Sequence, residues 1–219
     1  MNKILDNIKP YPIFKSLYKK EIKDIISSSN GTIKTFSKNN YIYHKGDNIN
    51  KFGIVLEGKI KIVNEDFWGN QNIISVIEPG EIFAEIFTFL QDTPLNVSVI
   101  SDTDSKVLLM NINNTNKTND IQNHNIIFLQ NLLNIMANKT FVLNRKIEYL
   151  SKRSTKEKIL SFLSNQAAQN KKQSFTIPFS RQELADFLAV DRSALSRELS
   201  KLQKEGIIEF NKNNFRLLK

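Results

Sequence analysis

Five side chains able to contact a polyanion lie between positions 192 and 201. They are two arginines, two serines and a lysine, namely Arg192, Ser193, Ser196, Arg197 and Lys201. An arginine can bond O6 and N7 of guanine together, and a serine hydroxyl can meet base edges or phosphates. Leu195, Leu199 and Leu202 fall on the opposite side of a predicted helix over residues 192–205. The sequence therefore predicts a helix that buries its leucines and presents a basic face suited to double-stranded DNA.

A second, shorter helix precedes this one. Ser180 and Glu183 fit a capping box that opens a helix over residues 181–188. Asp191 suits the N-cap of the following helix. The small side chain of Ala185 allows the two helices to cross closely. Two capped helices joined by a tight turn predict a helix-turn-helix.

The last residues of the chain predict a two-stranded wing. Gly206 suits the position after the end of the long helix. Residues 207–210 and 215–218 are apolar-rich strand candidates on either side of a polar turn at 211–214. The alternative is an ordinary helical hairpin whose basic face is merely solvated.

The net charge is concentrated at the same end of the chain. The 219 residues carry 31 Lys and Arg against 22 Asp and Glu, a net charge of +9. Residues 1–150 hold a net +2, whereas residues 151–219 hold 14 basic and 7 acidic residues, a net +7. A basic module on a nearly neutral one is expected when only one end of a protein meets nucleic acid.

A long apolar stripe lies before the basic module. Its eight positions alternate at spacings of three and four residues: Ile126, Leu129, Leu133, Met136, Thr140, Leu143, Ile147 and Leu150. Such a stripe is typical of a helix that packs against a partner helix, so we expect a homodimer seam. The alternative is a core helix lying along the N-terminal domain, because Phe128, Leu132 and Phe141 form a second apolar edge.

The N-terminal half predicts β-structure after a helix over residues 12–29. Short apolar or alternating runs, separated by turn residues, are strand candidates at 32–36, 41–43, 53–56, 59–63, 73–77, 97–100 and 106–112. Many short strands at near-regular spacing favour an antiparallel barrel, roll or sandwich. A further helix capped by Ser154 and Glu157 and a short strand at 175–178 precede the helix-turn-helix.

These elements, in this order, resemble the Crp/Fnr family of bacterial transcription regulators. The most specific stretches are residues 180–185 (SRQELA) and 191–197 (DRSALSR). The glycine turns at 44–47 and 56–60, and residues 78–85 (EPGEIFAE), are similar to those of cyclic-nucleotide-binding rolls. The resemblance implies an α+β protein with an antiparallel β-roll (double-stranded β-helix-like) sensor over 1–120, a dimerisation helix over 121–151 and a winged helix-turn-helix over 152–219.

The resemblance also assigns roles to single residues. Arg192 and Arg197 fall where the family reads base edges, and Ser180, Arg181 and Gln182 fall where it grips phosphates. Ser193 replaces a glutamate that is frequent on the family's recognition helix, so the half-site should differ from that of the cAMP receptor protein. The resemblance implies DNA on an inverted repeat and a second copy of the chain as partners, and it admits RNA polymerase as a third.

The sensor departs from the family's cyclic-nucleotide pattern. Glu85 stands where the family contacts ribose, but Leu95 and Asn96 occupy the positions of the phosphate-binding Arg and Ser or Thr, and Ala84 replaces a Gly. Burying a phosphate without a cationic partner is costly. We therefore expect an effector other than cAMP or cGMP, or constitutive DNA binding without an effector.

The composition excludes several other classes. The absence of Cys removes cysteine-ligated iron–sulfur clusters and disulfides, and two His residues are too few for multi-histidine metal sites. We expect no cofactor, no metal, no haem and no catalytic residues. A cupin-like barrel enzyme and an interaction module with a basic, membrane-contacting tail remain as alternatives. No uninterrupted apolar run approaches 18 residues, so we expect a cytoplasmic protein that does not contact a membrane.

Overall fold

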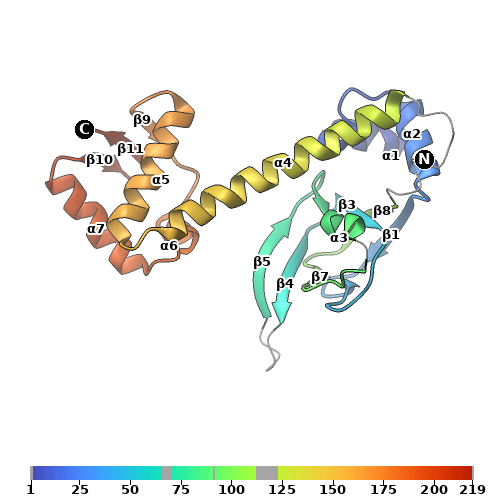
Figure 1. Ribbon diagram of the computed structural model, residues 1–219, viewed down its shortest axis with the longest axis horizontal. Coiled ribbons are helices and arrows are strands. Elements are labelled where there is room, and N and C mark those ends of the chain that lie inside the picture. The colour runs from blue at the N-terminus through green and yellow to red at the C-terminus, as the bar shows by residue number, and fades with distance from the viewer. Residues whose placement is uncertain (1, 66–70, 91, 112–122, 219) are drawn as a thin grey trace. The chain divides into compact units, whose positions relative to one another are not determined.

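The chain forms two compact units in the computed structural model, which describes residues 2–65, 71–90, 92–111 and 123–218 (Figure 1). Unit 1 comprises Met1–Met136 and unit 2 comprises Ala137–Lys219. The division falls inside one helix, α4 (Asn123–Ser151), which contributes residues to both. The predicted boundary between residues 120 and 121 lies outside the described residues. The fold is α+β, as the sequence predicts.

Two four-stranded antiparallel sheets form the roll in unit 1. One has the order β1-β8-β3-β6 and the other β2-β7-β4-β5. Their strands are β1 (Thr32–Phe36), β2 (Tyr41–Tyr43), β3 (Phe52–Glu57), β4 (Ile60–Glu65), β5 (Gln71–Ile77), β6 (Ile82–Phe83), β7 (Ser98–Ser101) and β8 (Ser105–Met110). Each predicted strand is present, although the last two residues predicted for β8 differ: Asn111 lies beyond the strand and Ile112 lies outside the described residues. The sequence analysis missed β6 and the helix α3 (Glu85–Phe89).

The two sheets share a core built from alternating side chains. Buried residues from six strands meet there, including Val55, Ile60, Val99 and Val107. Gly53 allows the sheet to close over the ring of Phe83, since a Cβ at this position would lie 1.9 Å from the Phe83 Cζ. The spacing of the core therefore depends on a residue without a side chain.

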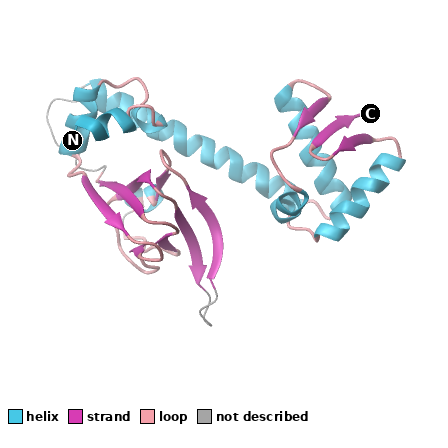
Figure 2. Ribbon diagram, turned by 180° about the vertical axis from the view of Figure 1, so that it is seen from behind, coloured by secondary structure: helices cyan, strands magenta, loops and turns pink. Residues whose placement is uncertain are grey.

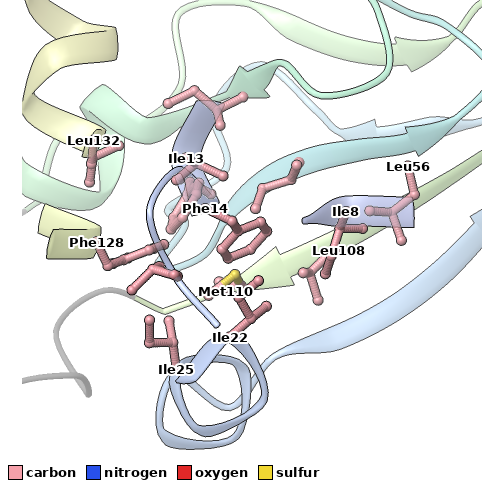
Figure 3. Close-up of a cluster of buried hydrophobic side chains, with 14 of the residues drawn as sticks. Ile8, Ile13, Phe14, Ile22, Ile25, Leu56, Leu108, Met110, Phe128 and Leu132 are labelled. Atoms are coloured by element: carbon pink, nitrogen blue, oxygen red, sulfur yellow. The ribbon is translucent and has the colours of Figure 1, made fainter. Parts of the chain in front are cut away.

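A second core lies between the N-terminal segments, the roll and the first turns of α4. The segments are α1 (Asn2–Ile8), the 3-10 turn Pro12–Phe14 and α2 (Lys19–Ser28). Their apolar side chains pack on Leu108 and Met110 and on Phe128 and Leu132 of α4 (Figure 3).

The single helix predicted over residues 12–29 is wrong. Ser16 takes a left-handed conformation with φ +64°, and Lys15 is extended with ψ 137°. This break lets Ile13, Phe14 and Leu17 all reach the core, which a continuous helix would not allow for three residues so close in sequence.

Unit 2 contains α5 (Thr155–Asn170), α6 (Arg181–Leu188) and α7 (Arg192–Lys204) with a small sheet (Figure 2). The sheet has the order β10-β11-β9, from β10 (Ile208–Asn211), β11 (Asn214–Leu217) and β9 (Ser174–Thr176). The wing thus has three antiparallel strands where two were predicted, because the strand before α6 pairs with β11.

Replacing Gly53 with alanine should lower the free energy of unfolding by about 1–3 kcal/mol, because the new methyl group overlaps the Phe83 ring. Chemical denaturation of the wild type and the variant measures this. The same substitution in a Phe83→Leu background, which removes the ring, should cost clearly less. Equal costs in the two backgrounds would contradict the assigned contact.

Candidate nucleic-acid interface

A basic groove runs along the outer face of α7. It has a volume of about 490 Å³ and is lined by Ser196, Arg197, Ser200, Lys201 and Lys204. All five side chains are exposed. Three of them were predicted from the sequence. Ser200 and Lys204 were not, although they continue the same face at a spacing of three to four residues.

The opposite face of α7 fixes this orientation. Leu195, Leu199 and Leu202 have no exposed surface and belong to the core of unit 2. Burying each leucine contributes about 1.5–3 kcal/mol, so α7 cannot rotate its basic side inward without a large loss of stability.

Asp191 organises the start of α7. Its Oδ1 accepts hydrogen bonds from the backbone N–H groups of Ser193 (2.8 Å) and Ala194 (3.1 Å) and from the Ser193 hydroxyl. The Ser193 hydroxyl and these N–H groups, together with the charge of Arg197, hold the pKa of Asp191 below its ordinary value. Arg192 is exposed beside the cap. Because its proton is engaged, Ser193 can still accept a hydrogen bond but has none to donate.

The turn between α6 and α7 is held by α5. Ala189 ends α6 in the left-handed region with φ +48°, and the buried Ala185 lies at the helix crossing. The Lys158 Nζ donates to the carbonyl oxygens of Leu188 (3.1 Å) and Ala189 (3.3 Å). A lysine at a helix C-terminus satisfies carbonyls that lack intrahelical partners and complements the helix dipole. Sequence reasoning missed this contact, since Lys158 lies 30 residues from Leu188.

The N-terminus of α6 has the predicted capping box. The Ser180 Oγ accepts from the Glu183 backbone N–H (3.2 Å), and the Glu183 carboxylate accepts from the Ser180 N–H (2.7 Å). Gln182 is exposed, and its Nε2 donates to the Asp186 Oδ1 at 2.8 Å. Arg181 instead turns toward the wing, where its Nη2 donates to the Lys212 carbonyl oxygen at 2.5 Å. The phosphate-gripping roles of these residues stay predictions.

In the roll, the predicted effector residues are brought only partly together. Ala84 takes the left-handed conformation with φ +61° before the short helix α3, and the Glu85 side chain is buried. Leu95 is also buried, and its backbone pairs with the turn opposite, donating to the Asp47 carbonyl (2.9 Å) and accepting from the Gly46 N–H (2.7 Å). Asn96 is exposed to solvent. The position expected to bind a phosphate is thus filled by an inward leucine.

Helix α4 uses its two apolar edges differently. Phe128 and Leu132 are buried in the core of unit 1, and Leu129 and Met136 pack partly against it. Leu133, Leu143 and Ile147 are 66%, 57% and 62% exposed, and the exposed stripe also includes Ile126, Thr140 and Leu150. By length and composition alone α4 is apolar enough to cross a membrane, with a window of mean hydropathy 1.3 that is 11% buried. A single helix of this kind is equally expected of a seam that awaits a partner helix.

Within the described ranges, no three His, Cys, Asp or Glu side chains gather where they could hold a metal ion.

A β-roll followed by a winged helix-turn-helix with an outward basic face defines a two-domain DNA-binding regulator. Residues 33–117 match the family model of the cyclic nucleotide-binding domain, and residues 157–219 match that of the Crp-like helix-turn-helix domain. This chain, with both domains in this order, belongs to the Crp/Fnr family of transcription regulators, whose members are not enzymes.

Solved structures share the fold at low sequence identity. The Catabolite Activator Protein of Thermus thermophilus is 19% identical, with a TM-score of 0.55 over 94% of this chain and 93% of that one. CprK in complex with OCPA is 15% identical, with a TM-score of 0.62 over 91% and 89%. The c-di-GMP-responsive regulator CLP of Xanthomonas campestris is 16% identical, with a TM-score of 0.55 over 92% and 100%. A comparison with curated proteins gives no match.

Proposed function

We propose that this protein is a cytoplasmic homodimeric transcription regulator that binds an inverted-repeat DNA site through α7 and responds to no cyclic nucleotide. The observation that carries the proposal is the exposed groove of Ser196, Arg197 and Lys201 on a helix whose other face is fully buried. In a helix-turn-helix the second helix enters the major groove, where arginine can read guanine. RNA polymerase stays a proposed further partner.

The dimer is proposed from the exposed stripe of α4. Leu133, Leu143 and Ile147 leave most of their surface in water in the single chain. Pairing with the same stripe of a second copy would bury them, and each leucine so buried would contribute about 1.5–3 kcal/mol. A two-fold dimer would place two copies of α7 in successive major grooves about 34 Å apart, which is why we propose an inverted repeat.

The effector is proposed to lack a cyclic phosphate. The buried Leu95 offers neither a charge nor a hydroxyl group at the expected phosphate position, and its backbone N–H and carbonyl already pair with the turn at Gly46 and Asp47. Structural neighbours are described with unrelated ligands, OCPA for CprK and c-di-GMP for CLP, so the fold does not dictate the ligand. An uncharged or organic-acid metabolite, or DNA binding without any effector, fits these residues; no iron–sulfur cluster, haem or metal is proposed.

Replacing Arg197 with alanine should weaken binding to a selected site by about 1–3 kcal/mol and relax the preference at one base pair per half-site. Lys201→Ala should weaken all sequences alike and lower the salt dependence of binding, as expected for a phosphate contact. Titration of labelled duplexes at several salt concentrations measures both. Lys172→Ala, which removes one exposed charge from the loop after α5, is the control. An unchanged site preference in Arg197→Ala would refute the assignment of α7.

Replacing Leu133 and Leu143 together with glutamate should give a folded monomer, because both side chains are exposed within one chain and only the seam loses apolar contacts. Light scattering gives the mass, and circular dichroism gives the fold. Asn134→Glu with Asn144→Glu adds the same charges to exposed positions of α4 off the stripe and should remain dimeric. A Leu133→Glu, Leu143→Glu protein at dimer mass would show that the seam lies elsewhere.

Millimolar cAMP or cGMP should leave the melting temperature and the DNA affinity unchanged, because the roll has no partner for the phosphate at Leu95. A ligand that binds only the folded state at 100 times its Kd stabilises it by ~2.7 kcal/mol, which a melting scan resolves. A selected DNA duplex serves as the positive control for a ligand-induced shift. A shift of several degrees with cAMP would overturn this part of the proposal.

A further inference from the structure

Arg181 makes three contacts with the wing. Its Nη2 donates to the carbonyl oxygen of Lys212 at 2.5 Å. Its Cζ lies 5.0 Å from the ring centroid of Phe210 and 5.1 Å from that of Phe215, within the range of cation–π attraction. Its Nη1 is shielded from solvent and has no hydrogen-bond partner among the described residues. The guanidinium is therefore directed at the wing and is poorly placed to meet a phosphate.

The contacts require the planar shape of arginine. The guanidinium lies against two aromatic rings and at the same time donates to a carbonyl in its own plane. Burial lowers the pKa of this group, because removing water disfavours its charge, and the two rings and the carbonyl offset part of that penalty. A lysine ammonium, a point charge with strong hydration, could not make the three contacts together.

The wing turn is the segment that these contacts hold. Lys212 takes a left-handed conformation with φ +51° between the paired residues Asn211 and Asn214. On its other side the turn is fixed by β9, where the Ile177 N–H donates to the Asn213 carbonyl oxygen at 2.9 Å. Arg181 and Ile177 thus hold two successive carbonyls of the turn, one each, and the Lys212 side chain itself stays exposed.

The turn is thereby tied to the end of the helix that meets the DNA backbone. In a helix-turn-helix the first helix crosses the sugar-phosphate backbone, and a helix N-terminus favours a phosphate. Arg181 is the first residue of α6, so the contact with the Lys212 carbonyl places the wing turn beside that end. A cation on this turn is then close to the backbone that α6 approaches.

We propose that Arg181 is a positioning residue that holds the wing turn so that the Lys212 ammonium contacts a DNA phosphate, while Arg181 itself makes no phosphate contact. The inference rests on the proposed function as a DNA-binding regulator. It assigns the backbone contact at this edge of the interface to the wing, and it assigns the conformation of the wing to α6.

The test uses the full-length protein and a selected duplex, and measures affinity against salt concentration. Lys212→Ala should lower the slope of log K against log salt by about 0.9, the value for one phosphate contact. Arg181→Ala should lower it equally, with an unchanged preference among sequences. The double variant should match the single ones, because both substitutions remove the same contact. Lys23→Ala, an exposed charge on α2, should change nothing.

Arg181→Lys separates positioning from direct contact. If Arg181 places the turn, lysine should behave as alanine does, whereas a direct phosphate contact would survive in large part. A Lys212→Ala variant with wild-type salt dependence, additive losses in the double variant, or an active Arg181→Lys protein would each overturn the inference. Since Lys212 is exposed, its variant folds even if Arg181→Ala does not. Wild-type protein without any sequence preference would instead refute the proposed function.

Discussion

The exposure of the basic face of α7 depends on the burial of the leucines behind it. Leu195, Leu199 and Leu202 pack into the same core as Phe162 and Leu184, and this core determines which way Arg197 and Lys201 face. The side chains that would contact DNA contribute little to stability themselves, since they are exposed and largely surrounded by water. Recognition is therefore set by packing on the far side of the helix, and the chemistry of the groove can vary without disturbing the fold.

Helix α5 makes this packing precise at both ends of the helix-turn-helix. Lys158 holds the carbonyls at the end of α6, and Lys156 pairs with Glu205 at the end of α7 with Nζ and Oε2 2.7 Å apart. Exposed ion pairs contribute little energy, but the Lys158 contact is partly buried and satisfies carbonyls at a strained turn. Residues far apart in sequence thus fix the angle at which α7 is presented.

The sequence predicted the elements whose signals are local. Capping boxes at Ser154 and Ser180, strand patterns in the roll and the heptad stripe of α4 depend on spacing within one element, and the structure has each of them. It could not predict the break at Ser16 or the left-handed turn at Ala189, because neither residue type favours that conformation and tertiary packing imposes it. The direction of the Arg181 side chain was missed for a related reason. Its partners in the wing lie about thirty residues away, so no window of sequence contains both.

The long helix has a practical consequence for cutting the protein into pieces. Tyr149, near the end of α4, is buried against Phe162 and Phe187 of unit 2, with ring centroids 5.7 and 5.9 Å apart. Phe128 and Leu132, near its beginning, belong to the core of unit 1. A fragment that starts at residue 152 would lose an aromatic side chain from its interior. Either half can keep its own interior intact only if the chain is severed between residues 132 and 149, within a helix and not at a loop.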